Sequence, residues 1–147
     1  MKEPLKIIGK VRARLLDETG RCKLEVILRN LITTLGKEAI AQNFFNDGTP
    51  PTLPTHIAVG SSATAPAVGD TALGGELTRL AFTSSSRSGA IVTYSVTFGA
   101  GVGTGTIEEL GLLNAAAAGT LYARFLSGTF DKGANDTLAI TWDLQFT

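Results

Sequence analysis

Few side chains in this sequence are of the types that perform catalysis or bind metal ions. Its 147 residues include a single Cys, Cys22, and a single His, His56. A zinc site needs about four Cys or His ligands, and a nucleophile needs a base beside it, so neither residue has the partners that such sites require. His56 opens an apolar segment after a Pro-rich stretch, and Cys22 follows a turn. We therefore interpret His56 as a structural residue and Cys22 as an incidental thiol.

The carboxylates do not form a catalytic pair either. Glu108 and Glu109 are neighbours on an expected strand. They should point to opposite faces, so they cannot act together on one sugar. Glu109 shares the face of Ile107 and is expected to point inward. A buried carboxylate of this kind is usually hydrogen bonded to backbone amides or paired with a cation, here Arg79 or Arg124.

Two further motifs are better explained as turns. Glycines alternate through residues 99–105, but a dinucleotide-binding fingerprint needs a glycine at position 104, where Thr stands. Asp131, Asn135 and Asp136 lack the spacing of an EF-hand loop, which favours a β-turn over a calcium site. We expect no enzymatic activity, no cofactor and no bound metal.

The N-terminal residues predict a β-hairpin. Apolar residues occupy most odd positions of residues 5–15, with Lys and Arg between them. Residues 17–20 supply turn chemistry, and Leu24, Val26 and Leu28 then share one side of a second strand. We expect this hairpin to have one apolar face and to protrude, so that a chain lacking residues 1–29 keeps a folded body.

The rest of the chain predicts one helix followed by short strands. The helix is expected at residues 33–45, with Thr33 or Thr34 as its N-cap, and the Pro-rich residues 46–54 end it. Alternating apolar residues then predict strands at 56–60, 77–84, 90–98, 106–113, 120–126 and 138–146. The fold class is therefore mainly β: an antiparallel β-sandwich or barrel with an N-terminal β-hairpin and one short α-helix. Residues 1–45 form the hairpin and helix region and residues 46–147 the β-sandwich body, within one compact domain.

Charge is balanced overall but unevenly distributed. Residues 1–45 hold nine basic and five acidic side chains, net +4, and residues 46–147 hold four basic and eight acidic side chains, net −4. This split either reflects the wet face of the hairpin or favours an oppositely charged neighbour, including another copy of the chain. If the hairpin is an assembly interface, its candidate residues are Lys6, Lys10, Arg12, Arg14, Arg21 and Lys23.

Two classes of partner are not expected. The balanced charge argues against a direct nucleic-acid role, because neutralising phosphates requires an excess of Lys and Arg. No segment approaches the ~20 apolar residues that span a bilayer, and the charged N-terminus lacks the apolar core of a signal peptide. We therefore expect no membrane partner and synthesis in a cytoplasm.

An ordered series of short motifs resembles a family of small virion structural proteins of tailed bacteriophages. The motifs are AVG at residues 58–60, TAP at 64–66, GDTAL at 69–73, ELGL at 109–112 and NDTLAITW at 135–142. The resemblance extends from about residue 7 to residue 146. Members are regarded either as capsid decoration or cement proteins or as tail or fibre components. The family brings no catalytic residues.

The resemblance implies location in the virion, with the major capsid protein or other virion proteins as partners. It also implies a homo-oligomer, commonly a trimer around a local symmetry axis. The leading hypothesis is a decoration or cement protein that stabilises the head at capsomer junctions. A second is a tail, fibre or baseplate component that contacts a receptor through residues 61–75 and 99–105. A third, a carbohydrate-binding β-sandwich, is disfavoured because Tyr94 and Trp142 are expected to point inward.

Overall fold

Nine antiparallel strands and one helix make up the part of the chain that the computed structural model describes, residues 3–45 and 52–147. In chain order they are β1 (Ile7–Leu16), β2 (Cys22–Ile32), α1 (Thr34–Phe44), β3 (His56–Gly60), β4 (Glu76–Ala81), β5 (Ser84–Ser88), β6 (Ile91–Phe98), β7 (Gly105–Leu113), β8 (Leu121–Lys132) and β9 (Thr137–Phe146). The predicted mainly β fold class is confirmed. Within these ranges, no helix has the length and apolar character needed to traverse a bilayer.

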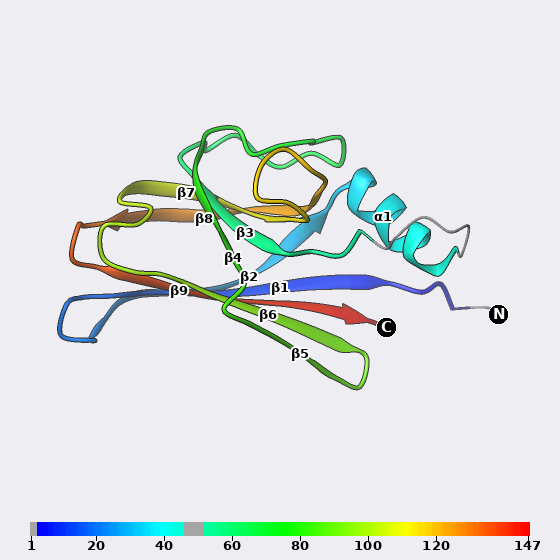
Figure 1. Ribbon diagram of the computed structural model, residues 1–147, viewed down its shortest axis with the longest axis horizontal. Helices are drawn as coiled ribbons and strands as arrows, with labels where there is room; N and C mark the ends of the chain where they lie inside the picture. The colour runs from blue at the N-terminus through cyan, green and yellow to red at the C-terminus, as the bar shows by residue number, and fades with distance from the viewer. Residues whose placement is uncertain (1–2, 46–51) are drawn as a thin grey trace.

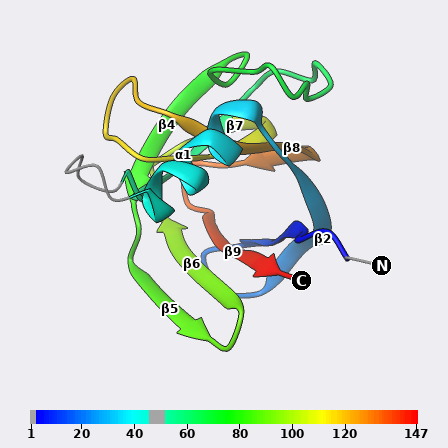
Figure 2. The ribbon, with the colours of Figure 1, turned by 90° about the vertical axis from the view of Figure 1, so that its right-hand side faces the viewer.

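The strands form one sheet that curls into two layers. Its order is β4-β3-β7-β8-β2-β1-β9-β6-β5. In Figure 1 the first four strands lie above the last four, and Figure 2 shows β2 passing from one layer to the other. Only the end of β2 joins the upper layer, where Leu31 and Ile32 pair with Arg124 and Ala123 of β8. Helix α1 lies at one end, between the layers.

The core fills the space between the layers. Alternation along β9 places Trp142 in it, fully buried, and the Trp142 ring meets Phe125 of β8 edge-on at a centroid distance of 5.7 Å. Val11 and Ala13 of β1 have no exposed surface. The expected protruding hairpin is therefore wrong. Strand β1 lies between β2 and β9 in the middle of the sheet, because its odd residues are needed to complete the core.

Most predicted elements are present, and the exceptions have simple causes. The strand predicted at 77–84 ends at Ala81, and β5 follows it as a separate strand. Sequence periodicity missed β5 because all five of its residues are polar and exposed. Strand β8 continues to Lys132, six residues beyond the predicted end. The Pro-rich residues 46–54, which are predicted to end the helix, lie mostly outside the described residues.

The helix has the predicted N-cap and depends on one glycine. The Thr33 hydroxyl accepts the N–H of Gly36 at 2.9 Å. A Cβ at position 36 would overlap the backbone carbonyl of Tyr122 in β8. Gly36 lowers the intrinsic helix propensity of the segment, but its lack of a side chain allows the backbone of α1 to pack directly against the backbone of β8.

Candidate assembly interface

Half of the predicted interface residues lie on β1, whose side chains alternate between the core and solvent. Val11 and Ala13 point inward and are buried, whereas Lys10 and Arg12 point outward and are exposed. Arg14, two residues further along, is half-buried on the same side. The strand period of two thus places three of the six candidate residues on one surface.

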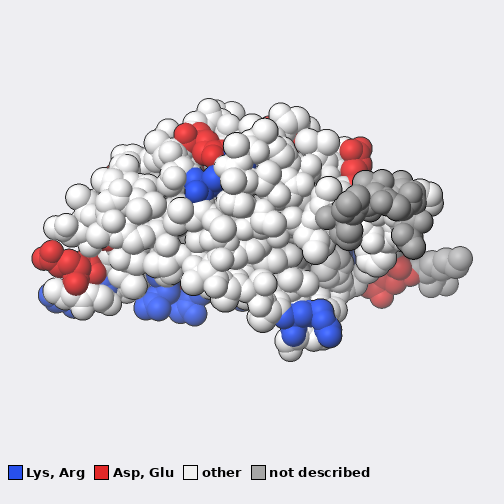
Figure 3. All heavy atoms as spheres, in the orientation of Figure 1, with Lys and Arg blue, Asp and Glu red and all other residues white. Residues whose placement is uncertain are grey.

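Strand pairing extends this surface across the lower layer. Lys10 is opposite Arg29 of β2 on one side and Asp143 of β9 on the other, and Asp143 is opposite Thr93 of β6. Residues directly opposite each other in antiparallel strands point to the same face. We call this surface the outer face; it includes Lys10, Arg12, Arg14, Glu25, Ile27, Arg29, Thr93, Ser95, Thr141 and Asp143. In Figure 3 the lower layer forms the bottom of the molecule, and Lys and Arg side chains project along it.

Positive charge on the outer face is only partly neutralised. The Glu25 carboxylate lies 3.2 Å from Arg12 Nη2 and 3.1 Å from Arg14 Nε. Lys10 and Arg29 are exposed and directly opposite each other, and in the described part of the chain neither forms an ion pair within 4.0 Å. Like charges in this arrangement repel. An oppositely charged partner would therefore relieve the repulsion between them.

The other three candidate residues lie away from this cluster. The Lys23 ammonium donates to Asp136 Oδ2 at 2.7 Å and so connects the hairpin to the turn between β8 and β9. That hydrogen bond is the main reason why the pKa of Asp136 is lowered. Arg21 lies at the hairpin turn, and Lys6 precedes the opposite end of β1. The structure thus gathers Lys10, Arg12 and Arg14 and adds Arg29, which the sequence analysis did not select.

The outer edge of β2 is unpaired over most of its length. Between residues 22 and 30 this strand pairs with β1 alone, because β8 pairs only with Leu31 and Ile32 at the end of the strand. Leu24, Ile27 and Leu28 remain 38%, 51% and 43% exposed. The expected apolar face of this strand is therefore mostly uncovered: of Leu24, Val26 and Leu28, only Val26 packs against the core.

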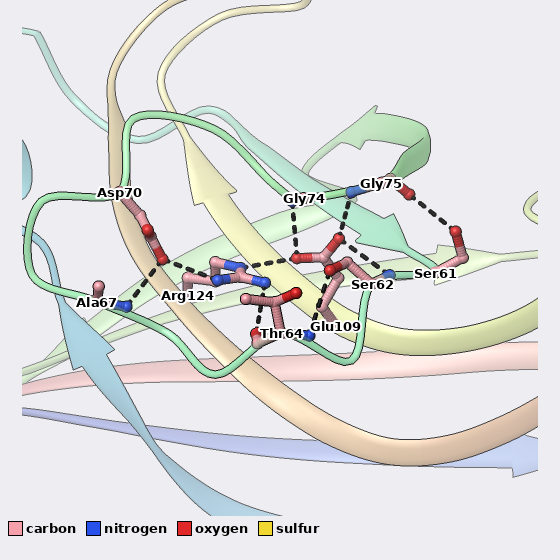
Figure 4. Close-up of polar contacts among 9 residues, drawn as sticks. All are labelled: Ser61, Ser62, Thr64, Ala67, Asp70, Gly74, Gly75, Glu109 and Arg124. Carbon is pink, nitrogen blue, oxygen red and sulfur yellow. Dashed lines mark hydrogen bonds and ion pairs between the residues drawn. The ribbon is translucent and has the colours of Figure 1, made fainter.

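On the opposite side of the molecule, a buried carboxylate organises the loop of residues 61–75 (Figure 4). Glu109 has no exposed surface. Its carboxylate accepts the backbone N–H groups of Gly75 at 2.7 Å, Gly74 at 3.1 Å and Ser62 at 3.3 Å. It also accepts Arg124 Nε at 2.7 Å. Four donors thus surround one carboxylate, and the loop is tied to β7 and β8.

The partner and the burial of Glu109 were foreseen, but its direction was not. Of the two expected cations, Arg124 is the partner, while Arg79 pairs with Glu76. Glu109 does not share the face of Ile107. The register of β7 shifts between these two residues, so Ile107 enters the core while Glu109 points outward and is buried beneath the loop.

Arg124 extends the network to the far end of the loop. Its Nη1 group donates to Asp70 Oδ2 at 2.8 Å and its Nη2 group to the carbonyl oxygen of Thr64 at 2.8 Å. Asp70 also accepts the backbone N–H of Ala67 at 2.9 Å. This backbone bond, followed by the bond from Arg124, lowers the pKa of Asp70. These bonds hold the loop of residues 61–75 against the body of the protein.

Other residues considered for chemistry have structural contacts. The hydroxyl of Thr55 lies 2.7 Å from His56 Nδ1, and the exposed Cys22 thiol forms no disulfide and donates to the carbonyl oxygen of Leu24 at 3.4 Å. No group of three or more His, Cys, Asp or Glu residues in the described ranges could hold a metal ion. Trp142 is buried, and the half-buried Tyr94 ring stacks on Phe82 at 4.4 Å, so neither ring forms an open sugar platform.

Comparisons with family models, with curated proteins and with solved structures found no match to this chain.

Proposed function

We propose that this protein is a structural component of a tailed-bacteriophage virion and acts as a decoration protein on the capsid. In this proposal the outer face binds an acidic surface of the major capsid protein. The virion assignment rests on the resemblance of the ordered motifs. The docking mode rests on one observation, the exposed and like-charged pair Lys10 and Arg29 on the β1 and β2 side of a broad sheet face.

Charge complementarity is the physical reason for assigning an acidic partner. Lys10 and Arg29 repel each other in the free protein, and Asp143, which is opposite Lys10 on its other side, forms no ion pair with it within 4.0 Å in the described residues. Carboxylates of a partner placed against Lys10 and Arg29 would offset this repulsion. The neighbouring side chains of β6 and β9 are Thr93, Ser95 and Thr141, which are half-buried and offer hydroxyl groups to a partner. A flat sheet face of this composition suits a polar, wet interface.

We further propose that the protein acts by binding and not by catalysis. Its most deeply buried ion pair in the described ranges, Glu109 with Arg124, is occupied in holding the loop of residues 61–75. These two groups therefore have a structural task that accounts for their burial.

A tail, fibre or baseplate location is the second candidate, and the braced loop favours it. Residues 61–75 lie on the upper layer, away from the outer face, and are held by Glu109 and Arg124 (Figure 4). A loop fixed in this way loses little conformational entropy when it binds a receptor. In this version the outer face attaches the protein to the virion and the loop faces the host.

A shell-binding experiment tests the decoration role. Capsids lacking the protein are mixed with purified protein, sedimented and heated. We expect co-sedimentation, a higher temperature of shell disruption, and binding that weakens with added salt. Lys10→Glu should reduce binding. Arg87→Glu is the matched control, because Arg87 is also exposed but lies on β5 outside the basic cluster. Failure of the unmodified protein to bind or stabilise shells would contradict the decoration role, and binding to tails alone would favour the second candidate.

A further inference from the structure

The unpaired edge of β2 presents an ordered row of backbone hydrogen-bonding groups. Lys6 and Thr147 exchange backbone hydrogen bonds at 2.6 and 2.8 Å, which extends the ladder between β1 and β9. Backbone groups of successive residues in a strand point to alternate sides. Even-numbered residues of β1 therefore bond to β9, and odd-numbered residues such as Val11 bond to β2.

The same alternation fixes which groups of β2 are free. Val11 is opposite Leu28, so the even-numbered residues of β2 bond to β1 and the odd-numbered residues point to the other edge. The N–H of Thr33, just after the strand, donates to Tyr122 of β8 on that same edge at 3.0 Å. From residue 23 to residue 29, the odd-numbered N–H and C=O groups have no strand to pair with in the described part of the chain.

The other two edges of the sheet are protected, and β2 is not. Strand β5 has five residues, all polar. On β4, Arg79 pairs with Glu76 and donates to the carbonyl oxygens of Ala115 and Ala118, so part of that edge is covered. Natural edge strands are usually short, polar or covered in this way. The unpaired stretch of β2 is longer and exposes apolar side chains on both of its faces.

We propose that this edge pairs with the same edge of a second copy of the chain, so that two β2 strands run antiparallel about a twofold axis at Ile27. The two sheets then become one continuous sheet, and their outer faces lie on the same side. This inference does not depend on the virion role, since it concerns the purified chain alone. It specifies a twofold contact, whereas the family resemblance implied a trimer.

Among the registers centred on Glu25, Val26 and Ile27, charge favours the one centred on Ile27. In that register Glu25 is opposite Arg29 of the second copy, and the pair occurs twice because of the symmetry. Moving the centre to Val26 would place Lys23 opposite Arg29, and moving it to Glu25 would place two carboxylates together. Both alternatives put like charges in direct opposition, which is destabilising.

The selected register also satisfies the backbone and covers apolar surface. The outward-pointing groups of Glu25, Ile27 and Arg29 meet the same groups of the second copy, as an antiparallel ladder requires. On the other side of the strand, Val26 is opposite Leu28 of the second copy, so the exposed Leu28 gains an apolar neighbour. Arg29 gains a carboxylate, and Lys10 stays exposed on the outer face.

A charge-exchange experiment tests the pairing and its register. We expect the purified chain to sediment as a dimer that dissociates on dilution. Arg29→Glu and Glu25→Arg should each weaken the dimer by at least about tenfold, because two attractive pairs become two repulsive ones. Mixing the two variants should restore a dimer, since each Glu then faces an Arg. A general folding defect cannot produce this recovery. A chain that stays monomeric when concentrated, or a mixture that stays monomeric, would overturn the proposal.

Disulfide trapping provides a second measurement, because Glu25→Arg also removes the contacts with Arg12 and Arg14. In a Cys22→Ser background, Ile27→Cys places two thiols opposite each other across the twofold axis, within the range that a disulfide can bridge. Mild oxidation should give a covalent dimer. Ser86→Cys, at the centre of the exposed strand β5, is the matched control and should remain monomeric. Equal trapping at the two positions, or a trimeric mass, would contradict β2 pairing.

Discussion

Replacing Glu109 by Gln tests whether the buried carboxylate holds the loop of residues 61–75. Oε1 accepts the N–H groups of Ser62 and Gly75, and Oε2 accepts those of Gly74 and Arg124. Whichever oxygen becomes an amide nitrogen, two buried donors lose their acceptor. Each loss costs about 1–3 kcal/mol, and breaking a buried ion pair costs about 3–5 kcal/mol in total. We expect a loss within this second range.

Urea denaturation measures this loss against a matched control. With a slope of about 2 kcal/mol per molar urea, the Glu109→Gln midpoint should fall by about 2 M. Glu108→Gln is the control, because Glu108 is half-buried and accepts one bond, from the Thr129 hydroxyl at 2.9 Å. Its change should stay within about 1 kcal/mol. In the Glu109 variant the amide of Gly75 should also exchange hydrogen faster. Equal midpoints for the two variants would refute this account of the network.

Two further predictions concern Asp70 in this network and the N-terminal hairpin. The pKa of Asp70 is below its ordinary value in the folded chain, so its contribution to stability is complete above that ordinary value and is lost as pH falls through the folded pKa. Asp70→Asn should therefore flatten the fall of the unfolding midpoint with acidification, and a parallel fall in both proteins would contradict this role. Deleting residues 1–29 should abolish cooperative unfolding, because it removes the buried Val11 and Ala13 and leaves β9 without its neighbour. A retained cooperative thermal transition, measured by near-UV circular dichroism, would show that the hairpin is dispensable to the fold.

Local sequence patterns were sufficient to predict a strand or helix where one face of that element is buried. Alternation predicted β6 and β9, and the cap at Thr33 marked the start of α1. Reflection about the turn of residues 17–20 would have placed Ile27 opposite Lys10, because the turn and the irregularity between Leu15 and Leu16 together displace the observed register by two residues and bring Arg29 there. The register shift is visible only in the structure, so the hairpin turn alone could not identify Arg29 as a member of the basic cluster.

By itself, the sequence determined the strand periods, the hairpin turn and the capped helix, because each depends on residues close together in the chain. Tertiary structure alone decided that β1 is a central strand, that Glu109 lies beneath a loop, and that the edge of β2 is open. These features depend on how far β8 follows β2 and on a register shift in β7. Pairing between distant strands is set by the packing of the whole core, and a local pattern of side chains does not specify it.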